Sequence, residues 1–358
     1  MANVFRLHVL AAEFGDCLWV DYGDPDAPHR VLVDAGTPGT FKRLRPALDL
    51  VRGPTPSHQL FIVTHVDADH IGGSLPILED ETLAAQFGEI WFNGRHHLVQ
   101  ASEEEAFGAV QGERLTSAIL ARKLPWNKRF KGRAVVRGAG DMPVTLDLDG
   151  GATITVLTPS LPQLQRLLPK WDRDVTEAGL DPVRPEIERE ETEGEESFGA
   201  MDVEALASEA TDEDTAEANG SSIATLIEFD GRRLLLGADA HPSVLLEGIN
   251  KLTGGKRLKV DVFKLPHHGS KANVTKALLE AVDAKVIVFS TNGKIFRHPD
   301  QEAVARVVKR YGKDAKLVFN YESKLNDMWK SQSLLDEWLY SVEYARGDDG
   351  VSVMVHEL

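Results

Sequence analysis

Short runs of apolar residues, separated by turn-forming residues, recur along the chain and predict many β-strands. Three such runs open the sequence, at residues 5–10, 17–22 and 30–36, and residues 60–64 have the composition of a buried strand. The same pattern predicts further strands at 89–92, 153–157, 222–229, 232–239, 260–265, 285–290 and 316–320. Between two of these runs, Asp230-Gly231 predicts a tight hairpin turn.

Helical patterns lie between some of these strands. We expect helices at residues 41–51, 241–252, 271–282 and 299–311, and a further helix that begins within residues 71–80. Residues 340–358 have the pattern of a last hairpin. No internal repeat is present. Two strand-rich halves, each with its own helices, predict an α/β (α+β) protein in which two sheets pack face to face with helices outside.

Charge is concentrated in one segment. The chain of 358 residues has a net charge of −16, and between Asp172 and Glu217 there are 18 acidic residues against three arginines. This segment therefore carries −15, and the rest is nearly neutral. Because it has few large apolar residues, we expect an acidic, largely flexible insertion with one short helix near residues 201–210. The alternative is an acidic segment that recruits a protein partner.

Composition favours a cytoplasmic protein with no membrane association. No apolar run approaches the roughly 20 residues of a membrane helix, and the start lacks the pattern of a signal peptide. The single cysteine, Cys17, excludes internal disulfides and fits a reducing compartment, and we expect it in the core.

Four metal-type side chains follow the predicted strand at 60–64. They are His65, Asp67, Asp69 and His70, in the stretch THVDADHIGG. Alternate residues of a strand point the same way, so His65 and Asp67 can share one face, while the two glycines allow a following helix to approach closely. The simpler alternative is a polar loop in which Asp69 caps a helix.

Two other strand ends carry similar groups. Asp239 directly follows the strand at 232–239, and His267 and His268 follow the strand at 260–265. A lone acid or histidine in such a place is usually structural, but three strand ends with ligand-type residues favour a metal centre.

These motifs, with NGSS at 219–222 and STNGKIFRHPDQEAV at 290–304, resemble the metallo-β-lactamase superfamily. More narrowly, they are similar to the β-lactamase-like domain of ComEC-type DNA-uptake proteins and its free-standing relatives. The resemblance extends over nearly the whole chain outside the acidic segment. It implies a single domain, residues 1–358, with residues 160–218 as an insertion, and a four-layer αββα sandwich.

The resemblance also implies two divalent metal ions at one edge of the sandwich. By position, His65 and Asp67 would bind one ion, Asp69, His70 and His267 the other, and Asp239 would bridge them. His268 would support a ligand or reach the substrate, and His298 would face the cleft or lie on the surface. Asp69 would also orient the attacking hydroxide.

One expected ligand is missing. The superfamily usually supplies another histidine between the first motif and the bridging aspartate, where this chain has Thr158. His96 and His97 could substitute for it in space, or could simply begin a helix. A weak or empty second site, and with it a mononuclear centre, therefore stays open. Asp67 in place of a histidine adds an oxygen ligand, so Zn²⁺ fits and Mn²⁺ becomes more acceptable.

Such a centre predicts hydrolysis by metal-activated water. Residues 115–140 contain no acid and seven basic residues, with aromatic residues among them. As substrate-binding residues we expect Arg122, Lys123, Trp126, Lys128, Arg129 and Lys131. This pattern suits a phosphodiester in a nucleic acid or nucleotide, and the alternative is a solvated loop with its aromatic rings in the core. Two other functions stay open: a hydrolase of carboxylic esters, lactones or thioesters, and a non-catalytic subunit with a degraded metal site.

Overall fold

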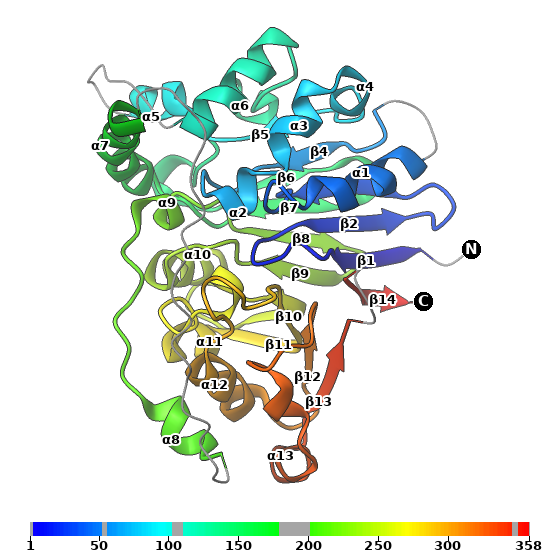
Figure 1. Cartoon of the computed structure of the whole chain (residues 1–358), viewed down its shortest axis with the longest axis vertical. Coiled ribbons are helices and arrows are strands. Elements are labelled where there is room, and N and C mark those ends of the chain that lie inside the picture. The colour runs from blue at the N-terminus through cyan, green and yellow to red at the C-terminus, as the bar shows by residue number, and fades with distance from the viewer. Residues whose placement is uncertain (1–2, 52–55, 102–109, 179–200, 346–349, 358) are drawn as a thin grey trace.

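The strands form two sheets that lie between helices (Figure 1). The computed structural model describes residues 3–51, 56–101, 110–178, 201–345 and 350–357. Within these ranges, the first sheet has six strands in the order β14 (Val351–Glu357), β1 (Val4–Val9), β2 (Leu18–Gly23), β3 (His29–Val33), β4 (Leu60–Ile62) and β5 (Ile90–Trp91). The second sheet has eight, in the order β13 (Ser341–Tyr344), β12 (Lys316–Phe319), β11 (Val282–Phe289), β10 (Leu258–Lys264), β9 (Arg232–Leu236), β8 (Thr225–Phe229), β7 (Thr153–Val156) and β6 (Val144–Asp147).

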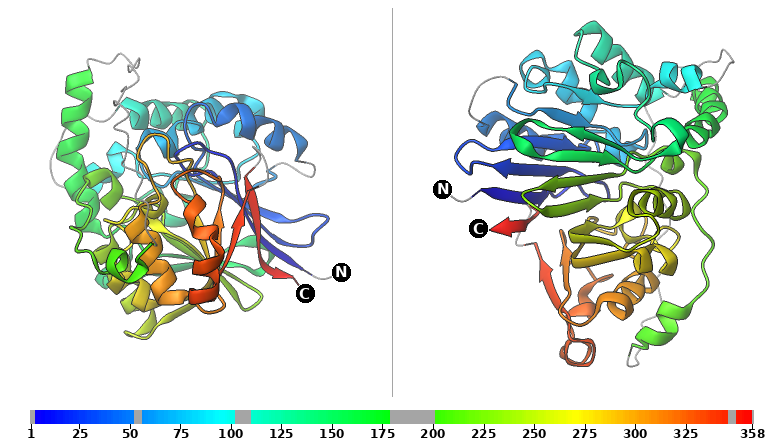
Figure 2. Two further views of the ribbon diagram at one scale, coloured as in Figure 1. Left: turned by 60° about the horizontal axis from the view of Figure 1, so that its bottom comes forward. Right: turned by 180° about the vertical axis from the view of Figure 1, so that it is seen from behind.

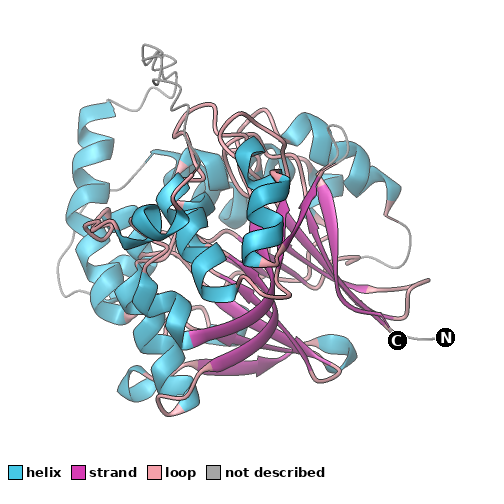
Figure 3. Ribbon diagram, turned by 90° about the horizontal axis from the view of Figure 1, so that it is seen from below, coloured by secondary structure: helices cyan, strands magenta, loops and turns pink. Residues whose placement is uncertain are grey.

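Helices cover the outer faces of both sheets (Figure 3). The helices in the first half of the chain are α1 (Phe41–Leu50), α2 (Ala68–Ile71), α3 (Ser74–Glu79), α4 (Glu81–Ala84), α5 (Arg95–Ala101), α6 (Val110–Ala121) and α7 (Leu161–Ala178). Those in the second half are α8 (Val203–Ser208), α9 (Glu217–Gly220), α10 (Pro242–Thr253), α11 (Lys276–Ala281), α12 (Gln301–Tyr311) and α13 (Gln332–Trp338). None of the helices in the described part of the chain is long and apolar enough to span a membrane.

Three clusters of buried apolar side chains separate the four layers. The middle cluster joins the sheets, with residues such as Leu7 of β1 facing Val262 of β10. A second cluster lies between the first sheet and its helices, and a third lies between the second sheet and its helices. Because successive strand residues point to opposite faces, a sheet buried on both sides needs apolar residues at nearly every position. The expected αββα sandwich is confirmed.

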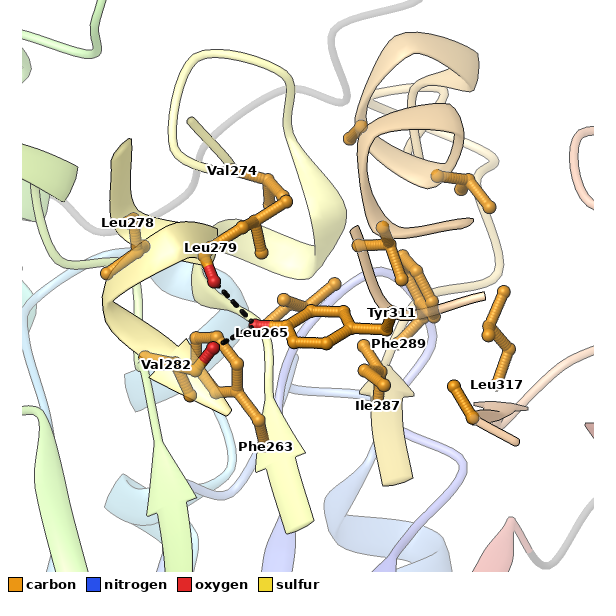
Figure 4. Close-up of a cluster of buried hydrophobic side chains, with 14 of the residues drawn as sticks. Phe263, Leu265, Val274, Leu278, Leu279, Val282, Ile287, Phe289, Tyr311 and Leu317 are labelled. Atoms are coloured by element: carbon orange, nitrogen blue, oxygen red, sulfur yellow. Dashed lines mark hydrogen bonds between the residues drawn. The ribbon is translucent and has the colours of Figure 1, made fainter. Parts of the chain in front are cut away.

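The third cluster shows how the outer helices are fixed (Figure 4). Tyr311, at the end of α12, lies among apolar side chains from α11 and the second sheet. Its hydroxyl lies 3.1 Å from the carbonyl oxygen of Leu279 and 3.2 Å from that of Val282. A buried hydroxyl needs such partners, so this contact helps to set the position of α12 against α11.

The predicted C-terminal hairpin is wrong. β13 extends the second sheet and runs parallel to β12, whereas β14 pairs antiparallel with β1 in the first sheet. β13 therefore pairs with the strand that precedes it in the chain, whereas the partner of β14 lies at the other end of the sequence. The helix expected at 271–282 begins only at Lys276, where Thr275 caps it.

Part of the acidic segment is packed rather than flexible, because it contains α8 and the end of α7. α7 buries Leu164, Leu167 and Trp171, and α8 buries Val203 and Ala207 against the third cluster. α7 and α8 lie at opposite ends of the molecule, and residues 209–216 run from α8 back to α9 (Figure 2). Residues 179–200, which carry eight of the 18 acidic residues, lie outside the described residues.

Candidate metal centre

The loop after β4 leads directly into α2 and carries four of the predicted ligands. Asp67 precedes the first turn of α2, makes no capping hydrogen bond, and has a side chain that is 44% exposed. Asp69 and His70 lie within α2 and are buried. Asp69 does not cap the helix, and its carboxylate lies 3.4 Å from Nε2 of His268. The loop thus points its polar groups inward, toward the other sheet.

Three other segments reach the same point. Asp16 precedes β2, Asp239 follows β9, and His268 lies in the turn after β10. One ligand-type atom from each of Asp16, His70, Asp239 and His268 lies within 4.8 Å of the other three, and all four residues are buried. Two imidazoles and two carboxylates are ligands that suit a divalent transition metal.

Asp239 lies at the centre of the arrangement. Its Oδ2 atom is 3.2 Å from Nε2 of His70, 3.6 Å from that of His268, 3.8 Å from that of His267 and 3.9 Å from that of His65. Its Oδ1 atom is buried and makes no hydrogen bond with a described residue. Four imidazoles therefore surround one carboxylate that still has an unused buried oxygen.

Hydrogen bonds set the tautomer of two of these histidines. Nδ1 of His70 donates to the Asp34 carboxylate at 2.7 Å, and Nδ1 of His268 donates to the carbonyl oxygen of Ser290 at 2.8 Å. In a neutral imidazole whose Nδ1 carries the proton, Nε2 has a free lone pair. Both Nε2 atoms are therefore ready to bind a metal ion.

In the other two histidines, His65 and His267, the Nδ1 atom also donates to an oxygen. The Thr64 hydroxyl donates to Asp34 at 2.8 Å, so it accepts from Nδ1 of His65 at 3.0 Å. Nδ1 of His267 donates to the amide oxygen of Asn273 at 2.9 Å. Histidine ligands typically donate their second ring N–H to an oxygen in this way, which orients the ring.

A positive charge is needed between these groups. Nε2 of His70 and Nε2 of His268 are 3.2 Å apart, and two lone pairs at that distance repel unless a proton or a metal ion lies between them. Burial opposes charge on His70, but the nearby carboxylates of Asp239, Asp34 and Asp69 outweigh it and raise the pKa of His70 well above its ordinary value. The residues present fit a bound divalent cation.

Three supporting residues were not predicted as part of the site. Asp34 accepts hydrogen bonds from His70 and Thr64, and Lys264 forms a buried ion pair with Asp16. Asp16 also lies 3.4 Å from Nδ1 of His268. Their signal in the sequence was a charged residue beside or within an apolar strand run.

Of the other three candidate histidines, His298 lies near the centre, whereas His96 and His97 pack elsewhere. His298 lies beside His267, with ring centroids 5.3 Å apart, and its Nδ1 is 3.4 Å from Asp300. The rings of His96 and His97 instead pack against Trp126, 4.4 and 4.7 Å from it.

The basic segment, residues 115–140, lies beside β5, the edge strand of the first sheet. Arg122 donates to the carbonyl oxygen of Glu79, Arg129 forms an ion pair with Glu89, and Trp126 donates to the carbonyl oxygen of Phe92. The ring of Phe130 packs on Trp91. Lys123, Lys128 and Lys131 are exposed.

Lys128 and Arg129 line a cavity of about 1010 Å³, together with Arg30, Gln59 and Glu89. Gln59 and Glu89 precede β4 and β5, and Arg30 lies near the start of β3. The metal-type residues His65 and Asp67 follow β4, so the cavity and the metal centre lie at opposite ends of these strands.

Comparisons with known proteins show only distant likeness. No protein-family model matches the chain, and no curated protein matches it. Among solved structures, it is similar to the metallo-beta-lactamase fold protein YhfI from Bacillus subtilis, at 10% identity over 98% of this chain and 99% of that one, with a TM-score of 0.43. For the short form of human tRNase Z the identity is 11%, all of both chains is covered, and the TM-score is 0.44.

A third similar structure is Zn²⁺-bound PqqB from Methylobacterium extorquens, at 12% identity over 95% of this chain and 87% of that one, with a TM-score of 0.39. Scores this low carry no functional argument.

Proposed function

We propose that this chain is a metal-dependent hydrolase of the metallo-β-lactamase superfamily, from its ComEC-type branch, and that its substrate is a phosphodiester. The observation that carries the proposal is a set of four histidines, three of them buried and His267 22% exposed, whose Nδ1 atoms all donate to oxygen. Their Nε2 atoms all lie within 3.9 Å of the same oxygen of Asp239. This is an arrangement of metal ligands rather than of core histidines.

Asp69, His70, His268 and Asp239 would hold one ion, and His65 with Asp67 would begin a second site. When bound, divalent ions lower the pKa of a water molecule and stabilise negative charge on the reacting oxygen. Three carboxylates among the ligands make Mn²⁺ a good candidate beside Zn²⁺.

The chain's own residues would orient the reactants. Asp67 is the most exposed of the acidic groups, so its free oxygen can accept a hydrogen bond from a water molecule at the surface of the centre. Asp34 and Thr64 hold the rings of His70 and His65. These contacts fix the ligands before substrate arrives.

Exposed apolar side chains beside the centre favour a phosphodiester substrate that carries a nucleobase. Phe296 and Ile295 are 43% and 45% exposed, and they lie in the loop that leads to His298. The Phe296 ring stacks on His298 with centroids 6.3 Å apart, and Phe14 packs edge-on against it at 5.6 Å. Exposed rings next to a hydrolytic centre suit stacking with a nucleobase.

The test pairs metal analysis with hydrolysis of bis-p-nitrophenyl phosphate. We expect purified protein to contain a transition metal and to hydrolyse this diester, and Asp69→Ala and His70→Ala to lose the activity. His8→Asn, at a histidine bound to Ser352 on β14, is the matched control and should keep it.

Two outcomes would replace the proposal. Hydrolysis of p-nitrophenyl acetate without hydrolysis of the diester would favour an ester substrate. Protein that binds neither Zn²⁺ nor Mn²⁺ would favour a non-catalytic subunit.

A further inference from the structure

The second metal position lacks a ligand where related enzymes have a histidine. Thr158 occupies the place expected for it, and its hydroxyl is already engaged. It donates to the carbonyl oxygen of Ser222 at 2.7 Å and accepts from the amide of Ala224 at 2.9 Å. Thr158 therefore joins β7 to the start of β8 and has no role that requires a metal.

His65 nevertheless has an unused ligand atom. Its side chain is fully buried, and its Nε2 atom has no hydrogen-bond partner among the described residues. Nε2 lies 3.6 Å from the Asp67 carboxylate and 3.9 Å from that of Asp239. A buried polar atom without a protein partner needs an explanation, and a metal ion between His65 and the two carboxylates would supply one. Two carboxylates and one imidazole leave room for one more protein ligand.

The contacts of His267 connect it to the segment beside His65. Its Nδ1 atom is 3.4 Å from the Asn219 amide, and Asn219 lies in α9, directly before the residues that lead to Ile223. The amide of Ile223 donates to the carbonyl oxygen of Thr64, directly beside His65. The contacts of His267 therefore lead to the end of β4.

His268 has a different set of contacts, which includes Nε2 of His70 at 3.2 Å. Its neighbours are Asp16, Ser290 and the Asp69 carboxylate. Adjacent residues in the sequence thus face two different parts of the centre.

The backbone of this turn makes the division possible. His267 and His268 both have positive φ, 46° and 54°, a conformation that is strained for a non-glycine residue. The amide of His267 donates to the carbonyl oxygen of Ala238 at 2.9 Å, which ties the turn to the loop that carries Asp239. The planes of the two imidazole rings are inclined at 74°, and their centroids are 5.9 Å apart.

We propose that the two adjacent histidines bind different metal ions. His268 binds the ion held by Asp69 and His70, while His267 completes the site of His65 and Asp67 and replaces the missing histidine. Asp239, whose Oδ2 atom lies within 3.9 Å of all four Nε2 atoms, would serve both sites. The inference rests on the proposed metal centre and corrects the assignment of His267 by sequence position.

Asp214 is a positioning residue for His267. Its Oδ2 atom lies 3.4 Å from Nδ1 of His267 and accepts from the amides of Asn273 at 3.0 Å and Asn219 at 2.7 Å. Asn273 in turn accepts from Nδ1 of His267 at 2.9 Å. The C-terminal part of the acidic segment, which contains Asp214, therefore lies against the predicted metal ligand His267.

Arg306 anchors this end of the acidic segment. It lies on α12 and donates to the carbonyl oxygen of Glu209 and to the hydroxyl of Thr211, three residues before Asp214. It also donates to the carbonyl oxygens of Lys271 and Val274, on either side of Asn273. The Arg306 side chain thus helps to position Asp214 and Asn273, the two partners of His267.

Paired substitutions test the assignment by metal stoichiometry. The full chain is loaded with Mn²⁺, dialysed, and measured for metal content and for the electron paramagnetic resonance signal of two coupled ions. We expect two ions in the wild type and one in each single variant, His65→Asn, His267→Asn and His268→Asn.

The double variants decide between the assignments. His65→Asn/His267→Asn should retain one ion, because both changes empty the same site, and His65→Asn/His268→Asn should retain none. The reverse pattern would overturn the inference and leave the proposed function standing, as would a wild type that binds a single ion. A wild type that binds no ion would overturn both. Far-UV circular dichroism checks folding, and His8→Asn should keep two ions.

Asp214→Asn tests the positioning role. Oriented ligands typically gain 10- to 100-fold in metal affinity, so we expect one of the two Mn²⁺ dissociation constants to rise about tenfold while the other stays unchanged. Asp212→Asn, at an exposed acid two residues away, is the control and should change neither. Equal weakening of both sites would contradict the role of Asp214.

Discussion

Replacing Lys264 with methionine isolates the buried ion pair beneath the metal centre. Lys264 ends β10 and pairs with Asp16, and neither residue is exposed to solvent. The other oxygen of Asp16 makes no hydrogen bond with a described residue and lies 3.4 Å from His268. Without the lysine, a buried carboxylate would lose its strongest counter-charge.

The expected loss is large because both groups are desolvated. Removing one partner of a buried pair costs about 3–5 kcal/mol, since the remaining charge stays buried. Replacing both partners with apolar residues of similar size is often neutral. Lys264→Met should therefore lower the free energy of unfolding by about 3–5 kcal/mol. Asp16→Leu/Lys264→Met should recover about 2 kcal/mol or more of that loss.

Urea unfolding followed by tryptophan fluorescence measures the effect. The experiment is done with EDTA present, so that metal binding does not contribute to stability. Lys251→Met, which breaks a surface pair with Asp141, is the control and should change little. A double variant that is less stable than either single variant, or a loss below about 1 kcal/mol in Lys264→Met, would refute this account of the pair.

Three further substitutions have defined outcomes. In Gly15→Ala the new Cβ would lie 1.8 Å from the carbonyl oxygen of Asp69, so we expect about 1–3 kcal/mol of destabilisation and weaker Mn²⁺ binding by calorimetry. Unchanged Mn²⁺ affinity would contradict this. Burial lowers the pKa of His58 to about 3, so the unfolded state takes up a proton first as the pH falls, and stability present above about pH 6.5 is lost toward pH 3. His58→Phe should remove this loss, worth about 1.4 kcal/mol per pH unit, and parallel pH profiles would argue against it. Tyr311→Phe should destabilise by about 1–2 kcal/mol in urea, because two carbonyl oxygens lose a buried donor, and an unchanged midpoint would count against that role.

Local pattern was enough to predict the sandwich and the place of the ligands. The strands at 60–64, 232–239 and 260–265 were recognisable from their apolar runs, and the polar residues that follow them converge as expected. Spacing along a strand decides which residues share a face, and strand ends decide where polar groups collect. Both are properties of neighbouring residues.

Packing between distant segments decided the rest. The pattern at residues 340–358 resembled a hairpin, but the two strands complete different sheets because each finds an open edge elsewhere. The basic run looked like part of the site, yet Lys128 and Arg129 lie at the opposite end of the strands from His65. Its position follows from how Trp126 and Phe130 pack into the first sheet.

The centre itself shows the same division. The sequence determined which residues can bind a metal, because the ligand types and their strand ends are local. Only the tertiary structure decided how they are held: Asp34 orients His70, Asp16 lies beside His268, and Asn273 sets the ring of His267. The tautomer of each histidine depends on an oxygen from another part of the chain, and such contacts exist only after the two sheets have packed together.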